Sequence, residues 1–160
     1  MRIAHILSGS PQEGRFFAAA ALAAEEVKRG HTTLLIAPYQ SDIRGVESTL
    51  LPIGKYSIFG FLKSLRGIIR LANRRGIDVL HAHSREAAEV ARIVAGFTGC
   101  GFVATLHVTD NKKLPPAAGR VYGDHVIAVC EEIRDEEVRR GRIAAQKITV
   151  IRNEIGRAHV

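Results

Sequence analysis

The chain has 160 residues, of which 46% are hydrophobic and 24% are charged, a composition that excludes a disordered segment and suits one globular domain. Basic residues outnumber acidic ones and give a net charge of +7. Only 6% of the residues are aromatic, tryptophan is absent, and the basic residues are spread over several predicted helices. The charge therefore favours a small anionic ligand or an anionic membrane surface over a nucleic acid.

The two cysteines and the amino-terminal residues indicate the cellular compartment of the protein. Cys100 and Cys130 have neither the spacing of metal ligands nor the density of a disulfide scaffold, so we expect reduced thiols. The first apolar run, from Arg2 to Leu7, is too short for a signal peptide or a membrane span and is typical of a buried strand. The predicted localisation is cytoplasmic, with peripheral contact at the inner membrane face.

Apolar runs bounded by polar or glycine-rich turns alternate with stretches of helical period. This alternation predicts βαβ units, and so an α/β fold with a mainly parallel, doubly wound sheet in three layers. A weaker strand is expected near Thr49–Pro52. The other predicted strands are Arg2–Leu7, Thr32–Ala37, Val79–Ala82, Phe102–Leu106, His125–Ala128 and Lys147–Ile151.

Helices are predicted between these strands. The first covers Arg15–Arg29 and ends before Gly30, and Ser84 is the expected N-cap of another that packs a row of alanines inward. A third runs from about Cys130 to Arg140, and Lys112–Gly119 is expected to be a loop or a broken helix because of its two prolines.

Residues 60–75 predict an amphipathic helix with a basic side. Its apolar side is formed by Phe61, Leu62, Leu65, Ile68, Ile69 and Ala72. Its basic side is formed by Lys63, Arg66, Arg70 and Arg74. A solvated outer face explains this pattern, and docking on an anionic membrane surface is the alternative.

The turn after the first strand leads directly into a helix amino terminus, where free backbone N–H groups favour an anion. Pro11 stands where a dinucleotide-binding turn has its second glycine. Gly9 and Gly14 have the separation of a P-loop, but Arg15-Phe16 replaces its Lys-Ser/Thr pair, which argues against an ATPase. A tight turn without a ligand remains the alternative.

Two strands end in polar groups at positions where parallel sheets bind ligands. Asp78 to Ser84 finishes on His83 and Ser84, and Phe102 to His107 finishes on Thr105 and His107. These groups can donate, accept and titrate near neutral pH, so they predict one edge of a polar cleft. A lone strand-end histidine is often structural, and no third ligand stands at a recognisable spacing for a metal.

Two further histidines, His5 and His81, lie inside predicted strands. We expect both to be buried and to serve the core rather than chemistry.

Taken in order, these motifs resemble the N-terminal half of a GT-B glycosyltransferase of the family-4 type. The resemblance runs from Met1 to Asn153. It rests on the glycine-containing turn, Arg29-Gly-His31, Asp78-Val-Leu-His-Ala-His83, Thr105-Leu-His107, Asp124-His-Val-Ile-Ala-Val-Cys130-Glu and Lys147-Ile-Thr-Val-Ile-Arg-Asn153.

The resemblance implies a Rossmann-like domain that forms the acceptor side of a cleft, with a sugar nucleotide held by a following domain. It implies a catalytic role for His107, which would hold or polarise an acceptor or donor-sugar hydroxyl. No metal and no cofactor other than the nucleotide-sugar substrate is expected. The resemblance also implies an edge for the acceptor and the donor phosphate at Gly9 to Gly14. Together with the strand ends, this predicts the substrate-binding residues Ser8, Gly9, Gly14, Arg15, His83, Ser84 and Thr105.

The last residues depart from the family pattern, which continues after Asn153 with glycine, an apolar residue and aspartate. The segment 154–160 instead resembles a translated sequencing adapter. We therefore expect residues 1–153 to be the native domain, residues 154–160 to be a non-native tail, and a donor-binding domain to be absent. Such a fragment is expected to be inactive alone.

Two other functions remain open at this point. One is a stand-alone Rossmann-like module that binds an anion or nucleotide at Gly9–Gly14. The other is a non-catalytic domain that binds a membrane or a protein partner through the basic helix.

Overall fold

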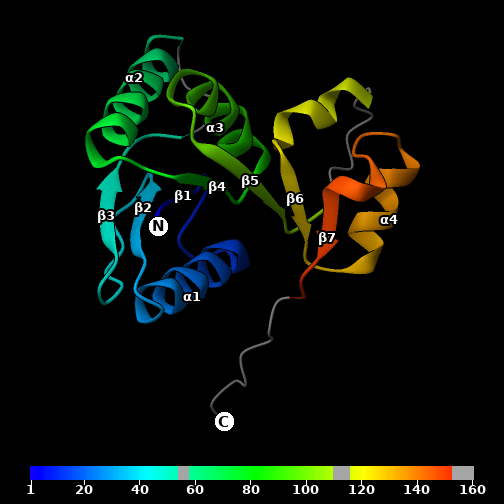
Figure 1. The fold of residues 1–160 in the computed structure, drawn as a ribbon, viewed down its shortest axis with the longest axis horizontal. Coiled ribbons are helices and arrows are strands. Elements are labelled where there is room, and N and C mark those ends of the chain that lie inside the picture. The colour runs from blue at the N-terminus through cyan, green and yellow to red at the C-terminus, as the bar shows by residue number, and fades with distance from the viewer. Residues whose placement is uncertain (54–57, 110–115, 153–160) are drawn as a thin grey trace.

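The computed structural model of the chain describes residues 1–53, 58–109 and 116–152. Seven parallel strands form one sheet in the order β3-β2-β1-β4-β5-β6-β7 (Figure 1). The strands are β1 Arg2–Ile6, β2 Thr32–Ala37, β3 Glu47–Leu50, β4 Val79–Ala82, β5 Gly101–Leu106, β6 His125–Ala128 and β7 Ile148–Val150.

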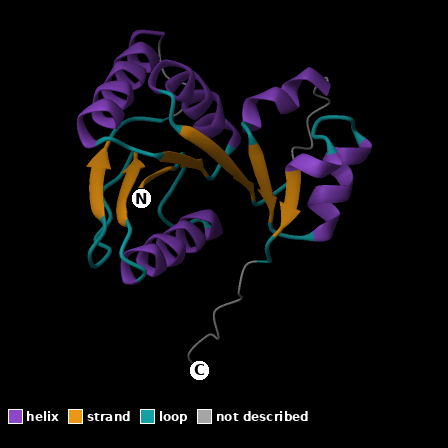
Figure 2. Cartoon of the chain, in the orientation of Figure 1, coloured by secondary structure: helices purple, strands orange, loops and turns teal. Residues whose placement is uncertain are grey.

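Helices cover both faces of the sheet (Figure 2). On one side lies α1, while α2 and α3 pack together on the other, and α4 packs along β6 and β7 (Figure 1). The 3-10 segment η1 contacts α3. Their bounds are α1 Gly14–Lys28, α2 Ile58–Arg75, α3 Arg85–Thr98, η1 Pro116–Tyr122, α4 Glu131–Arg139 and η2 Ala145–Lys147.

The strand order reverses between β1 and β4, because the chain first adds β2 and β3 on one side and then β4 to β7 on the other. A crevice forms at the carboxyl ends of strands at such a switch point. The core on the α2–α3 side is built from branched aliphatic and alanine side chains, which lets α3 approach the sheet closely. The predicted α/β fold with a parallel sheet is confirmed.

Most element predictions agree with the structure. The weak strand is β3, which lies at Glu47–Leu50 rather than Thr49–Pro52, and the predicted N-cap Ser84 accepts a hydrogen bond from the Ala87 N–H at 3.1 Å. Of the predicted loop 112–119, residues 116–119 belong to η1, and the remainder lies outside the described residues. The predicted non-native tail 154–160 also lies outside them.

The helix predicted at 60–75 is present as α2, but one of its apolar positions was wrong. Leu62 is 48% exposed, whereas Ser64 is buried and donates to the carbonyl oxygens of Pro52 (2.7 Å) and Gly60 (3.0 Å). A serine hydroxyl can be buried here because the loop before α2 and the preceding turn supply acceptors. That partner is set by the tertiary fold and is invisible in the helical period.

Gly123 provides a test of packing between η1 and β6. Its φ is +87°, and a Cβ atom there would lie 2.3 Å from Cδ1 of the buried Phe102. We expect Gly123→Ala to lower the free energy of unfolding by about 2 kcal/mol, because it adds left-handed strain and an overlap in the core. Urea denaturation measures this. Gly96→Ala, at a helical glycine with open space around it, is the control and should leave stability unchanged or raise it.

Candidate functional site

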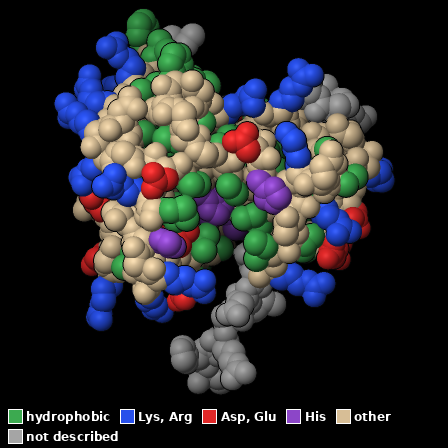
Figure 3. Space-filling view, viewed as in Figure 1, with side chains coloured by type: hydrophobic (Ala, Val, Ile, Leu, Met, Phe, Trp, Pro, Cys, Tyr) green, Lys and Arg blue, Asp and Glu red, His purple; other side chains and the backbone are tan. Residues whose placement is uncertain are grey.

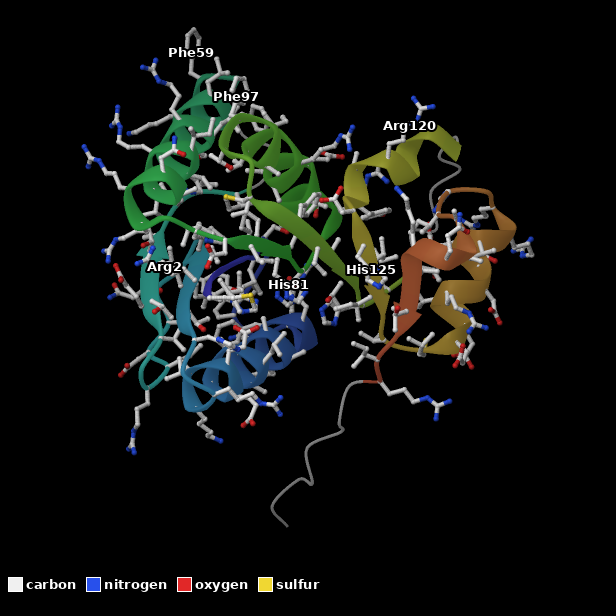
Figure 4. The ribbon with its side chains drawn as sticks, in the orientation of Figure 1. Arg2, Phe59, His81, Phe97, Arg120 and His125 are labelled. Atoms are coloured by element: carbon white, nitrogen blue, oxygen red, sulfur yellow. The ribbon has the colours of Figure 1, made fainter. Side chains whose placement is uncertain are left out.

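The face of the sheet beneath α1 carries a row of polar side chains. His5 of β1 pairs in register with His81 of β4, so the two lie side by side on this face. Side chains alternate along a strand, so His83 and Thr105 lie two residues further along and on the same side. His5, His81 and His83 are all buried, as predicted for the first two. Figure 4 shows His81 between the sheet and α1.

A series of hydrogen bonds begins at a carboxylate of α1 and runs through the rings of His5, His83 and His107. The Glu26 Oε2 atom lies 2.8 Å from His5 Nε2, and His5 Nδ1 lies 2.9 Å from His83 Nε2. His83 Nδ1 is in turn 3.5 Å from His107 Nε2, which is the longest contact of the series. We call Glu26, His5, His83 and His107 the histidine network.

His81 stands beside this network. Its ring stacks on that of His83 with centroids 4.2 Å apart, and its Nε2 atom lies 2.7 Å from the Thr105 hydroxyl. Thr105 therefore has a fixed partner, which orients its hydroxyl at the strand end.

Burial controls the ionisation of the three rings. It lowers the pKa of His81 to about 3, helped by the positive charge that His5 and His107 would carry. The pKa of His83 lies well below its ordinary value for the same reason, with His81 adding to the effect. Burial, followed by the nearby Arg15 guanidinium, lowers the pKa of His107 to about 4. All three imidazoles are neutral at pH 7, and each then has one donor and one acceptor nitrogen.

Nitrogen atoms of His5, His81 and His83 lie within 4.8 Å of one another, which is close enough for three metal ligands. The lone pair of an imidazole lies in the plane of its ring. Because the rings of His81 and His83 are stacked only 29° from parallel, their lone pairs do not converge on one point. His5 and His83 also share a hydrogen bond at the nitrogens that would bind. The geometry favours hydrogen bonding over chelation.

A pocket of about 210 Å³ opens at the carboxyl ends of β4 and β5. It is lined by Arg15, His83, Ser84, Arg85, Glu86, Thr105, Leu106, His107, Val108, Thr109 and Tyr122. Five of the eight residues that the sequence predicted for the site line it: Arg15, His83, Ser84, Thr105 and His107.

Ser8 reaches the same region through a hydrogen bond. Its Oγ lies 2.7 Å from Ser84 Oγ and donates to Glu86 Oε2 at 3.3 Å. Ser84 donates to Ser8 while accepting from the Ala87 N–H, so the end of β1 is tied to the amino terminus of α3. Sequence reasoning missed Glu86 and Tyr122, which carry no motif and enter the pocket only through the packing of α3 and η1.

The glycine turn lies beside the pocket rather than in its lining. Gly9 has φ +86°, which a glycine adopts without strain. The Glu13 carboxylate accepts from the Ser10 N–H at 3.0 Å and pairs with the Arg15 guanidinium. Gly14 begins α1. An anion bound at this turn would compete with Glu13 for Arg15.

The fold and site can now be compared with known proteins. A family model described as Glycosyltransferase Family 4 matches residues 18–155, which is most of the sequence. The chain belongs to glycosyltransferase family 4. No curated protein matches the sequence significantly.

Solved structures share the fold of this family-4 chain. A glycosyltransferase from Rickettsia africae ESF-5 superposes with a TM-score of 0.80 at 20% identity, over 94% of this chain and 42% of its own. Anabaena HepE in complex with UDP and glucose gives 0.75 at 16% identity, over 96% and 44%. The lipopolysaccharide outer core galactosyltransferase WaaB gives 0.72 at 18% identity, over 95% and 45%. The chain thus spans less than half the length of each.

Proposed function

We propose that the chain is the N-terminal, acceptor-side half of a glycosyltransferase that moves a sugar from a nucleotide-sugar donor to an acceptor hydroxyl. The supporting observation is the pocket at the carboxyl ends of β4 and β5, where His107, Thr105 and Arg15 meet in a domain of glycosyltransferase family 4. HepE, a structural neighbour, is in complex with UDP and glucose. That neighbour supports a nucleotide-sugar donor.

The residues of the pocket suit positioning better than covalent catalysis. Neutral His107 can hold or polarise a hydroxyl, and Arg15 offers positive charge to a phosphate or a developing anion. The proposal includes retention of stereochemistry and independence of a metal. It also includes inactivity of this half alone, because a GT-B site forms only when two domains meet. Envelope or surface-glycan synthesis in bacteria is the proposed setting, supported by the neighbour WaaB, a lipopolysaccharide outer core galactosyltransferase.

Sugar transfer is the direct test. The enzyme that contains this domain is incubated with labelled UDP-, ADP- and GDP-sugars and a panel of glycan and lipid-linked acceptors, in parallel with the 160-residue chain. Transfer by the longer protein and none by the chain supports the proposal. Tight nucleotide binding by the chain alone, with no transfer by either protein, favours a stand-alone binding module.

Membrane contact through α2 is the second part of the proposal. Lys63, Arg66, Arg70 and Arg74 are all exposed, and Figure 3 shows Lys and Arg side chains gathered along the outer side of this helix. Phe59, at the amino-terminal end of α2, is 81% exposed (Figure 4). Within residues 1–53, 58–109 and 116–152, no helix has the length and apolarity needed to cross a bilayer. Contact would therefore be peripheral for this part of the chain.

The basic side of α2 should bind anionic vesicles weakly and in a salt-sensitive way. Each exposed basic residue near an anionic leaflet contributes about 1 kcal/mol, and the attraction fades beyond about 8 Å at physiological salt. Co-sedimentation with phosphatidylglycerol vesicles at two salt concentrations measures it for the wild type and for a variant with all four residues changed to Gln. A variant with the same loss of charge elsewhere, at Lys28, Arg29, Arg139 and Lys147, is the control. Equal binding by all three proteins would show that α2 is only a solvated face.

A further inference from the structure

The histidine network begins at the Glu26 carboxylate, which lies on the side of α1 that faces the sheet. Its side chain is 14% exposed, and Oε2 accepts from both His5 Nε2 (2.8 Å) and the Thr33 hydroxyl (3.2 Å). Its neighbour Glu25 points outward, with a side chain 48% exposed, and pairs with Lys28 and Arg29. The inward carboxylate thus has partners in two strands that the surface carboxylate lacks.

An ionised carboxylate can only accept hydrogen bonds, so beside a neutral His5 it sets the direction of every later bond in the histidine network. A neutral His5 must carry its proton on Nε2 to donate to Glu26, and its Nδ1 is then an acceptor. His83 must then carry its proton on Nε2, which leaves His83 Nδ1 as an acceptor for His107 Nε2–H. The lone pair of neutral His107 is therefore on Nδ1.

We propose that Glu26 is a positioning residue that acts through His5 and His83 to set the tautomer of His107, so that this ring presents Nδ1 as the acceptor at the pocket. A histidine that must accept a hydrogen bond from a substrate hydroxyl, or take its proton, needs one defined tautomer. The order of a carboxylate, an orienting contact and a base is a general device for holding an imidazole. In this chain the contact between carboxylate and base is made through two imidazoles, His5 of β1 and His83 after β4.

Other titratable groups also face this network. His81 stacks on His83 from the same strand, Arg15 approaches from α1, and Arg85 and Glu86 line the pocket from α3. His81 is committed to Thr105, and Glu86 accepts from Ser8, so neither supplies the acceptor that His5 uses. Glu26 is the carboxylate that orders the rings.

Ring-nitrogen NMR of the histidine-labelled chain tests this assignment without any assay of sugar transfer. In long-range ¹H–¹⁵N spectra at pH 7.5, His5, His83 and His107 should each carry the proton on Nε2. Glu26→Met removes the acceptor while keeping the length of the side chain, and should move the His5, His83 and His107 nitrogen shifts toward those of mixed tautomers. Glu25→Met, the matched surface control, should leave all three unchanged.

Several results would overturn the proposal. One is a proton on Nδ1 of His107 in the wild type, which decides the question even where Glu26→Met does not fold. Another is an unchanged His107 tautomer in folded Glu26→Met. A third is stoichiometric Zn²⁺ binding by the chain with loss of the His5–His83 N–H, because the network would then be a metal site.

The consequence for catalysis rests on the proposed function and is measured separately. In the enzyme, Glu26→Met should lower kcat in proportion to the population of His107 that loses the Nε2–H tautomer, with KM little changed. A shift of the His107 tautomer with no change in kcat would contradict the positioning role of Glu26. A protein that transfers no sugar under any condition would count against the proposed function and leave the NMR result intact.

Discussion

Replacement of His107 with alanine should lower the turnover of the enzyme by about 10²–10⁴-fold, the loss typical of a positioned hydrogen-bonding or proton-transfer group. His107 lines the pocket and is neutral at pH 7, because burial and Arg15 lower its pKa to about 4. A neutral ring can accept a hydrogen bond from a substrate hydroxyl, which an imidazolium cannot do. His107 is only partly buried at the end of its strand, so the melting temperature should change little.

His125→Ala is the matched control for this experiment. His125 is an exposed histidine of β6 that bonds to the Thr149 hydroxyl at 2.9 Å, and Figure 4 shows it on the β6–β7 side of the molecule, away from His81. Its loss should leave turnover unchanged. If His107→Ala kept its activity and the melting temperature fell sharply, His107 would be a structural histidine and the site would be assigned wrongly.

The fold was predictable from the sequence because its signals are local. Each strand is an apolar run bounded by turn residues, and β4 and β5 end directly before His83 and His107, where the pattern changes. Parallel strands carry their carboxyl ends to one edge, so two strand ends close in sequence order predict one site. Arg15, at the start of the helix that follows β1, lines the same pocket.

The histidine network was not predictable, because its partners are far apart in sequence. His5 and His83 are 78 residues apart, and Glu26 is 21 residues from His5. The period of two places His81 and His83 on one side of β4, but the pairing of β1 with β4 is what brings His5 to them. Likewise, in the sequence Glu26 is simply one of two adjacent acidic residues in a predicted helix. Only the packing of α1 on β1 and β2 distinguishes it from Glu25.

Acidification should destabilise the folded chain well above the pH at which carboxylates titrate. Burial lowers the pKa of His81 to about 3 and that of His83 well below its ordinary value. In the unfolded chain both rings titrate near 6.5, so below that pH the unfolded state binds more protons than the folded state, and stability falls as the pH falls. The stabilising contribution is complete above pH 6.5. For His81 it is lost progressively between pH 6.5 and about 3.

His81 alone should cost about 1.4 kcal/mol for each pH unit below 6.5, because one pKa unit corresponds to about 1.4 kcal/mol per group, and the lowered pKa values of His83 and His107 add to this loss. Urea denaturation at pH 7.5, 6.0 and 5.0 measures this loss. His81→Gln, whose amide can still bond to Thr105, should have a weaker pH dependence by one histidine's share, whereas the exposed-site variant His125→Gln should retain the wild-type dependence. Equal stability at pH 7.5 and 5.0 would mean that the buried rings take up protons in the folded state. That result would contradict the lowered pKa values of His81 and His83.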